Sequence, residues 1–235
     1  MTSRGAIRKL VASLGLLGLA RAAFERIAPR LGWGAMEFPT FDPAIQRAAL
    51  ASGDYARYAS LALAIRRIEE ERIAGAFAEV GVYRGATSRF ILRCTPGRTL
   101  YLFDTFEGFP LEDREPENRG DARFRDTSAE AVRRALGAGD NVVIRKGRFP
   151  GTAAGLEGET FAFVLLDLDV FEPTLAGLEF FYPRLAPGGY LFVHDYNSPE
   201  SNQACRRAVT KFMADKRERL VELPDVWGSV VIRKA

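Results

Sequence analysis

The stretch Phe77–Asp104, FAEVGVYRGATSRFILRCTPGRTLYLFD, decides the fold class of this chain. It begins with a short apolar segment at Phe77–Val82 and turns at two glycines. It then runs through a helical segment at Thr87–Arg93 into a second apolar segment at Thr99–Phe103. Short apolar runs joined by a helix are typical of parallel strands whose two faces are covered by helices. The stretch therefore predicts the first strand–helix–strand unit of a doubly wound α/β domain.

The same alternation of apolar runs and helical segments continues to the C-terminus. Further strands are predicted at Val142–Arg145, Phe161–Leu166 and Tyr190–Val193, and further helices at Ala129–Leu136, Thr174–Tyr182 and Gln203–Lys216. The last apolar stretch, Trp227–Ile232, is expected to complete the sheet as an edge strand. Before the first strand, residues 44–74 are predicted to be helical and to end at Gly75.

The composition is that of an ordinary globular protein and narrows the classes of function. Of 235 residues, 47% are hydrophobic and 27% are charged. The net charge of +3 is too small to indicate nucleic-acid binding, so no nucleic-acid partner is expected. Cys94 and Cys205 form no CxxC motif, which favours a reducing compartment and a cytoplasmic protein. A single histidine, His194, argues against a multi-histidine metal site.

Residues 1–43 are expected to form an N-terminal helical extension, and residues 44–235 the main domain. In the extension, basic residues precede the apolar run LVASLGLLGLA at 10–20, which is too short to span a bilayer. Three interpretations stay open: a helix that packs on the domain or on a second subunit, a membrane-surface helix, and a cleaved signal peptide. We expect a homo-oligomer, with peripheral membrane contact through residues 4–27 as an open alternative.

The segment Thr105–Thr127 is long, highly charged and poor in periodicity. A loop of this length in a compact domain is often a lid or a binding loop, and a solvated excursion is the alternative. A substrate pocket is expected to be built by this loop, by residues 44–60 and by the segment after Asp195. Three residues of 44–60 are candidates either for contact with the substrate or for packing: Tyr55, Arg57 and Tyr58.

Two glycines and two acids form a candidate cofactor signature. Gly81 and Gly85 follow the first strand with Gly-x-x-x-Gly spacing, and Asp104 ends the second strand, 23 residues after Gly81. This spacing differs from the Gly-x-Gly-x-x-Gly turn that holds a pyrophosphate, which counts against NAD or FAD. Asp104 can accept hydrogen bonds from both hydroxyls of a ribose, and Glu79 can engage an amino group of the ligand or orient the turn. The set suits a nucleoside with an amino-acid tail and no phosphates, namely S-adenosylmethionine (SAM).

Four segments of the chain resemble the macrocin O-methyltransferase family. They are EVGVYRGATS at 79–88, LYLFDTFEGFP at 100–110, LLDLDVFEPTLAGLEFFYPRLAPGGYLFVHDY at 165–196 and ACRRAV at 204–209. Members of this family methylate sugar hydroxyls on antibiotics such as tylosin, mycinamicin and novobiocin. The resemblance covers about residues 45–235. It implies a mostly parallel, seven-stranded, Rossmann-like methyltransferase sheet, SAM as the cofactor, and a small sugar-bearing molecule as the acceptor.

The residues expected to contact the cofactor gather at the ends of the strands and in the loop after the third strand. They are Glu79, Gly81, Val82, Tyr83, Gly85, Ser88, Asp104, Arg148 and Asp167. The segment Lys146–Phe149 lies where this fold normally covers the adenine, so Arg148 is expected to stack on that ring. Ordinary surface charge is the alternative role for Arg148.

Asp167 and Asp195 end two strands that are expected to lie side by side. Because ligands of open α/β sheets bind at the carboxyl ends of strands, the two carboxylates can converge on one point. They repel each other unless a cation or a proton lies between them, and oxygen-rich sites suit Mg²⁺ or Mn²⁺. The alternative is that they cap the helices that follow. The family resemblance implies that Asp167, His194 and Asp195 hold Mg²⁺ and that Asp169 occupies the position of the proposed general base.

At His194 the chain departs from the family, in which an acid is usual. A neutral imidazole removes one negative charge from the site, which weakens Mg²⁺ binding and favours a borderline metal such as Mn²⁺, Fe²⁺ or Zn²⁺. Two alternatives are a catalytic base, since an ordinary histidine pKa lies near neutral, and a structural residue satisfied by hydrogen bonds.

Three functions are compatible with these patterns. The first is a SAM-dependent, divalent-metal-assisted O-methyltransferase that acts on a hydroxyl of a glycosylated small molecule. The second is a metal-independent methyltransferase of the same fold. The third is a non-catalytic SAM-binding or membrane-associated partner protein. Bound divalent metal separates the first from the second, and turnover with an acceptor separates both from the third.

Overall fold

The computed structural model describes residues 42–115 and 119–235. Contacts within the chain form two compact units, residues 1–55 and 56–235. In the first unit the helix α3 (Pro43–Ala51) begins at Asp42, whose carboxylate accepts a hydrogen bond from the Ala44 amide at 2.6 Å. The predicted division after residue 43 stays a prediction, and the N-terminal helix expected within residues 4–27 lies outside the described residues. Among the described residues, no helix is long and apolar enough to cross a membrane.

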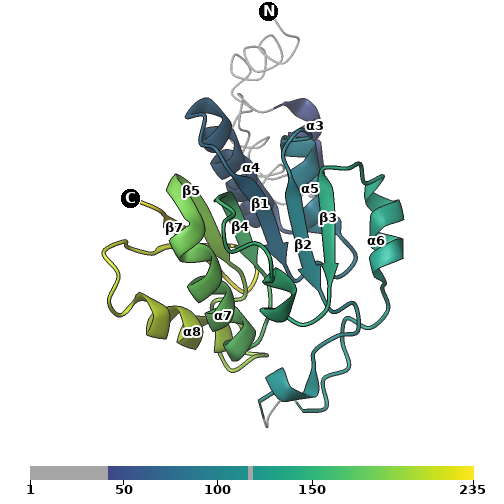
Figure 1. The fold of residues 1–235 in the computed structure, drawn as a ribbon, viewed down its shortest axis with the longest axis vertical. Helices are drawn as coiled ribbons and strands as arrows, with labels where there is room; N and C mark the ends of the chain where they lie inside the picture. Colours follow the sequence, from purple (N-terminus) through teal and green to yellow (C-terminus); the bar gives the residue numbers. More distant parts are fainter. Residues whose placement is uncertain (1–41, 116–118) are drawn as a thin grey trace, which may run out of the picture. The chain divides into compact units, whose positions relative to one another are not determined.

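The second unit is built on one seven-stranded sheet with the order β3-β2-β1-β4-β5-β7-β6. The strands are β1 (Ala76–Val80), β2 (Leu100–Asp104), β3 (Val142–Lys146), β4 (Phe161–Leu166), β5 (Leu185–Val193), β6 (Val221–Leu223) and β7 (Ser229–Arg233). The first five strands run parallel, while β7 pairs antiparallel with both β5 and β6. The predicted doubly wound α/β fold with a mostly parallel, seven-stranded sheet is therefore confirmed (Figure 1).

Helices cover both faces of this sheet because successive strand residues point to opposite sides. The helices are α4 (Tyr55–Glu70), α5 (Ala86–Cys94), α6 (Ala129–Leu136), α7 (Phe171–Phe181) and α8 (Ala204–Met213). α7 and α8 pack against each other and against a core that includes Ala78, Val164 and Leu191. The neighbouring residues of the same strands carry an aromatic row on the other face, with 5.2 Å between the ring centroids of Phe77 and Phe163.

Two sequence predictions about the sheet need correction. The edge strand after β5 is β6 and not the segment around Trp227–Ile232, since β7 lies between β5 and β6. β6 has only three residues, Val221–Leu223, two of them exposed, so it leaves no apolar run in the sequence. β5 begins at Leu185, five residues before the predicted start, because its Pro-Gly-Gly segment continues the strand instead of ending it.

Candidate active site

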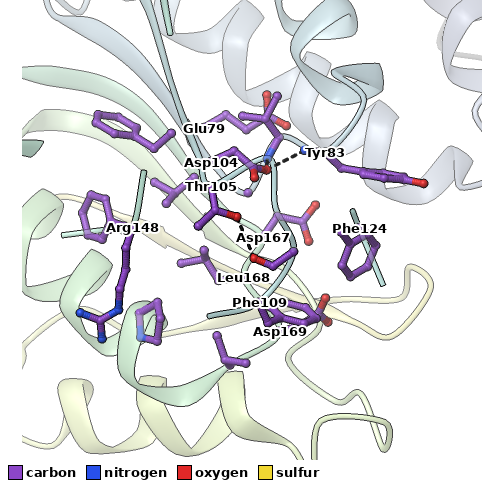
Figure 2. Close-up of a pocket in the computed structure, with 18 of the residues that line it drawn as sticks. Glu79, Tyr83, Asp104, Thr105, Phe109, Phe124, Arg148, Asp167, Leu168 and Asp169 are labelled. Carbon is purple, nitrogen blue, oxygen red and sulfur yellow. Dashed lines mark hydrogen bonds between the residues drawn. The ribbon is translucent and has the colours of Figure 1, made fainter. Parts of the chain in front are cut away.

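A cavity of about 360 Å³ opens at the carboxyl ends of β1, β2 and β4. The strand order reverses between β1 and β4, which is the switch point where open α/β sheets bind their ligands. The size lies within the usual range for small-molecule sites. Figure 2 shows acidic side chains along the centre of this cavity, Arg148 at one end, and aromatic rings near Asp169 at the other.

The glycine turn after β1 lies directly against the end of β4. Gly81 has φ +91° and donates its amide to the carbonyl of Phe103 at 2.9 Å. A Cβ on Gly81 would lie 1.8 Å from the carbonyl oxygen of Asp167. Gly81 is therefore needed for this approach and lines the cavity. Gly85, with φ +74°, precedes the first residue of α5 and does not line the cavity.

Asp104, at the end of β2, is hydrogen-bonded to the turn that follows β1. One carboxylate oxygen accepts hydrogen bonds from the amides of Val82 and Tyr83, at 2.7 and 2.8 Å. The other accepts from the amide of Phe106 at 2.6 Å. A carboxylate has about four acceptor sites, so three amides leave capacity for a ligand hydroxyl. Asp104 lines the cavity, as does Thr105 beside it.

Glu79 lies in the same cavity wall with almost no exposed surface. Burial raises the pKa of Glu79 to about 8, although the hydroxyl of Ser88 donates a hydrogen bond to its carboxylate. Ser88 is itself fully buried on α5 and does not line the cavity. The contact that the structure gives Ser88 is with Glu79, so its expected contact with the cofactor stays a prediction.

Arg57 on α4 reaches the acid at the end of β4. Its guanidinium Nη2 lies 2.5 Å from Oδ2 of Asp167. Burial alone would raise the pKa of Asp167, but the charges of Arg57 and His194 outweigh it and hold that pKa well below its usual range. Arg57 lines the cavity, whereas the sequence offered it only as one of three candidates in residues 44–60. Asp167 therefore carries its negative charge between two cationic groups.

His194 lies between the two carboxylates that were predicted to converge. Its Nδ1 is 3.1 Å from Oδ1 of Asp167 and 2.8 Å from Oδ2 of Asp195. Burial alone would lower the pKa of His194, but Asp167 and Asp195 outweigh it and raise the pKa to about 10. The ring is thus an imidazolium at neutral pH. Its Nε2 is buried and has no hydrogen-bond partner among the described residues.

The predicted metal ligands have a spacing that fits a divalent ion. One donor atom from each of Asp167, His194 and Asp195 lies within 4.8 Å of the others. In octahedral coordination with bonds of about 2.0–2.1 Å, adjacent donors lie roughly 3 Å apart. The distances from His194 Nδ1 match this value, and Arg57 occupies only the other oxygen of Asp167. The three donor atoms therefore fit a divalent ion once Nδ1 of His194 has lost its proton.

Asp169 is the third residue after β4 and lines the cavity, and Asp195 is buried. Burial, together with the carboxylates of Asp195 and Asp167, raises the pKa of Asp169 well above its ordinary value. Asp169 and Asp195 have φ angles of +60° and +55°. Non-glycine residues adopt this conformation at a cost and often do so at functional sites.

The charged segment Thr105–Thr127 forms part of the cavity wall. Its members there are Thr105, Gly108, Phe109, Pro110, Asp113 and Phe124. Asp113 belongs to the short turn η2 (Leu111–Asp113) and receives two hydrogen bonds from Nε of Arg148, at 3.0 and 2.9 Å. Arg148 therefore fastens this loop beside the cavity. Its expected stacking on an adenine stays a prediction.

Comparison with known proteins agrees with this geometry. A family model described as "Macrocin-O-methyltransferase (TylF)" matches residues 44–228. The chain belongs to the macrocin O-methyltransferase family. The resemblance drawn from the four sequence segments is thereby confirmed.

Two similar curated proteins are named as O-methyltransferases of antibiotic compounds. A 30% identical relative is 8-demethyl-8-(2,3-dimethoxy-alpha-L-rhamnosyl)-tetracenomycin-C 4'-O-methyltransferase of Streptomyces olivaceus, and the match covers 65% of this chain and 63% of the relative. Mycinamicin III 3''-O-methyltransferase of Micromonospora griseorubida is 31% identical, with 60% of this chain and 61% of the relative covered. The chain thus matches somewhat under two thirds of the length of either relative.

Solved structures give the same fold. The O-methyltransferase NovP superposes with a TM-score of 0.65 at 28% identity, over 77% of this chain and 80% of that chain. A calicheamicin methyltransferase superposes with a TM-score of 0.62 at 22% identity, over 74% of this chain and 77% of that chain, which shows the fold alone.

Several cavity residues of this macrocin O-methyltransferase family member had no individual role predicted from the sequence. Among them are Phe109, Asp113 and Phe124, all in the loop Thr105–Thr127. An acid or an aromatic residue in a charged loop carries no periodic signal, so only the expectation of a binding loop pointed to them. Seven of the nine expected cofactor contacts line the cavity, and Gly85 and Ser88 do not.

Proposed function

We propose that this chain is a SAM-dependent O-methyltransferase that methylates a hydroxyl of a sugar carried by a small molecule. The observation that carries this proposal is a single cavity that joins the Gly81 turn and Asp104 to the acid Asp169. A cofactor at the Gly81 turn and a proton acceptor at Asp169 would thereby share one space. The family match and the sugar-modifying relatives support the choice of reaction and acceptor class.

Residues at the β1 and β2 ends would hold the cofactor. Asp104 would accept the ribose hydroxyls, the Gly81 turn would allow close approach of the amino-acid tail, and Glu79 would face its amino group. A cationic amino group next to Glu79 would favour the charged form of that carboxyl, which burial alone disfavours. SAM supplies a methyl group that the adjacent sulfonium charge already activates, so the remaining task of the chain is largely orientation.

Asp169 is the residue that we assign as the proton acceptor. It lines the cavity, and its pKa is raised, which brings a carboxylate closer to the pKa that general-base catalysis at neutral pH requires. The proton of the acceptor hydroxyl would pass to a carboxylate oxygen of Asp169 as the hydroxyl oxygen forms its bond to the methyl carbon. The bond between that carbon and the sulfur would break at the same time, and its electron pair would stay on the sulfur of the leaving S-adenosylhomocysteine. The carboxylate of Asp195 would act on this position through its charge, which contributes to the raised pKa of Asp169.

Asp167, His194 and Asp195 would hold the divalent ion, Mg²⁺ or Mn²⁺, in the metal-assisted form of this function. When bound, such an ion would lower the pKa of an acceptor hydroxyl and fix its oxygen. His194 would bind as a neutral imidazole, and Arg57 would keep Oδ2 of Asp167 turned away from the ion.

One observation favours a second candidate, the same methyl transfer without a metal. Two carboxylates, Asp167 and Asp195, already face two cations, Arg57 and the His194 imidazolium. The charge that a metal would supply is therefore provided by the chain itself. Activity in the presence of a strong chelator would favour this candidate, and loss of activity that Mg²⁺ or Mn²⁺ restores would favour the metal-assisted form.

The test of the proposed reaction is turnover. Purified chain, SAM and a panel of rhamnosylated aromatic polyketides and macrolides are incubated with and without divalent metal, and methylated product is followed by mass spectrometry. Product from at least one acceptor, absent for Asp169→Asn, is the expected result. A folded protein that binds the cofactor product yet methylates no panel member would favour the non-catalytic alternative. The expected homo-oligomer, the cytoplasmic location and the membrane contact through residues 4–27 stay predictions.

A further inference from the structure

Three aromatic rings line the end of the cavity next to Asp169. Phe109 and Phe124 come from the loop Thr105–Thr127, and their ring centroids are 5.3 Å apart with perpendicular planes. Tyr83, from the glycine turn, lies 5.1 Å from Phe124 at 74°. All three side chains are half-buried and line the cavity, so they present apolar surface that the described residues leave partly uncovered. We call these three residues the aromatic wall.

The backbone places Phe124 in this wall at a cost. Its φ of +63° is rare for a bulky residue and needs support from the surrounding contacts. Arg123 gives that support, since its guanidinium lies 5.2 Å from the ring centroid of Phe124 and 5.9 Å from that of Phe109. The same guanidinium forms ion pairs with Asp121 and Glu200 at 2.8 Å. A half-exposed ring that is held in this way is a candidate for ligand contact.

The wall is also fastened to the cofactor turn. The hydroxyl of Tyr83 donates to Asp126 at 2.7 Å, and the hydroxyl of Thr127 donates to the carbonyl of Tyr83 at 2.8 Å. These two bonds join the end of the loop to the residue whose amide contacts Asp104. The position of the rings is therefore set relative to the proposed cofactor site.

The aromatic wall lies at the other end of the cavity from Arg148, the residue that is expected to stack on the adenine. Figure 2 shows Phe124 and Phe109 on the side of Asp169, with Arg148 on the opposite side of Asp167. A molecule on the wall would thus lie next to the proposed proton acceptor. The cations near the wall and the acids, Arg123, Arg57 and His194, are each already paired with carboxylates. Among the described residues, these cations are therefore not free to pair with an anionic molecule, while the rings offer faces and edges to C–H groups.

We propose that Phe109, Phe124 and Tyr83 form the acceptor subsite and pack against the C–H face of an uncharged pyranose ring, whose hydroxyl then faces Asp169. This inference rests on the proposed function and deepens it, because it assigns the acceptor contact and the charge class of the sugar. The wall selects for a neutral sugar with an apolar face and against a uronic acid.

The experiment measures sugar binding and cofactor binding separately. Protein saturated with S-adenosylhomocysteine is mixed with methyl α-L-rhamnopyranoside, and ligand signals are read by saturation-transfer NMR, with methyl glucuronide as the anionic comparison. S-adenosylhomocysteine affinity is measured by calorimetry. We expect saturation transfer to the rhamnoside, concentrated on the C–H protons of one ring face. The saturation-transfer signal of the glucuronide should be at least about five-fold weaker.

Variants locate the contact. Phe124→Ala and Phe109→Ala should each weaken rhamnoside binding about ten-fold, with the S-adenosylhomocysteine affinity changed less than about two-fold. Phe124→Leu, which keeps apolar bulk without a ring, should lose binding too, and Phe124→Tyr should retain it. Leu111→Ala is the matched control, since Leu111 belongs to the same loop, is 75% exposed and does not line the cavity.

Three results would overturn the proposal: rhamnoside binding that survives both alanine variants, full rhamnoside binding by Phe124→Leu, or equal saturation transfer to the glucuronide. A loss of S-adenosylhomocysteine affinity without a loss of rhamnoside binding would also overturn it, because it would assign the rings to the cofactor. Binding of S-adenosylhomocysteine without any rhamnoside signal would overturn the subsite and leave the cofactor assignment standing. Failure to bind S-adenosylhomocysteine would instead overturn the proposed function itself.

Discussion

The α-carbon of Gly81 lies so close to Asp167 that a Cβ on the glycine would come within 1.8 Å of the aspartate's carbonyl oxygen. This approach joins the cofactor turn after β1 to the acid that ends β4. One carboxylate oxygen of Asp167 contacts the guanidinium of Arg57, and the other contacts Nδ1 of His194. The two halves of the proposed chemistry therefore share one rigid junction.

Gly81→Ala should disrupt this junction. Because the clash is with backbone and φ is +91°, the ends of β1 and β4 must separate. We expect a loss of about 2–4 kcal/mol in the free energy of unfolding and of most S-adenosylhomocysteine affinity. Urea unfolding and calorimetry measure both. Gly97→Ala is the control, since a Cβ there meets nothing within 4 Å, and equal effects of the two substitutions would contradict the account.

Arg57→Met should leave the charge of Asp167 without its closest cation. Because Asp167 keeps some exposure, we expect a loss of about 2–3 kcal/mol in unfolding free energy, below the full cost of breaking a buried pair. Arg67→Met on the same helix removes only exposed surface pairs and should cost less than about 1 kcal/mol. A double-mutant cycle with Asp167→Asn measures the coupling. Additive effects would show that the 2.5 Å contact contributes nothing.

Glu79 should make stability depend on pH with a defined sign. Its folded pKa of about 8 lies above the ordinary value of 4.5, so the folded state binds more protons between these values. The contribution is fully present below about pH 4.5 and is lost as pH rises through about 8. Wild-type protein should therefore lose stability relative to Glu79→Gln across this window. Urea midpoints of both proteins near pH 5 and pH 8.5 test this, and a difference that does not change with pH would contradict it.

Features that depend on neighbouring residues or on strand order could be predicted from the sequence. The apolar runs of β4 and the helix α6 were predicted with the bounds that the structure has. The meeting of Asp167 and Asp195 followed from one topological rule, that neighbouring parallel strands end at the same edge. These features are local patterns or direct consequences of strand order.

The contacts that the sequence left open join distant segments through side chains. Arg57 and Asp167 are 110 positions apart, and Asp113 and Arg148 are 35 apart. Nothing in an arginine on an apolar helix, or an acid in a charged loop, indicates its partner. The charge state of His194 is likewise set by two carboxylates that surround the ring only in the folded chain.

Divalent metal should compete with the proton on His194. The donors fit an ion only when the ring is neutral, and its pKa in the metal-free arrangement is about 10. Affinity for Mn²⁺ should therefore increase as pH rises from about 6 to 9. His194→Asp, which restores the acid usual in the family, should bind Mg²⁺ more tightly at neutral pH. Calorimetry measures both affinities, and an Mn²⁺ affinity that falls with rising pH would contradict this assignment.

The proposed function depends on SAM binding by the Gly81 turn and Asp104, and calorimetry of S-adenosylhomocysteine with metal-stripped protein measures this binding. We predict micromolar binding, a loss of at least about fifty-fold in Asp104→Asn, and unchanged binding in Asp140→Asn, an exposed aspartate outside the cavity. Circular dichroism establishes that the variants are folded. Absence of binding by the folded wild-type protein, or full binding by Asp104→Asn, would contradict the claim.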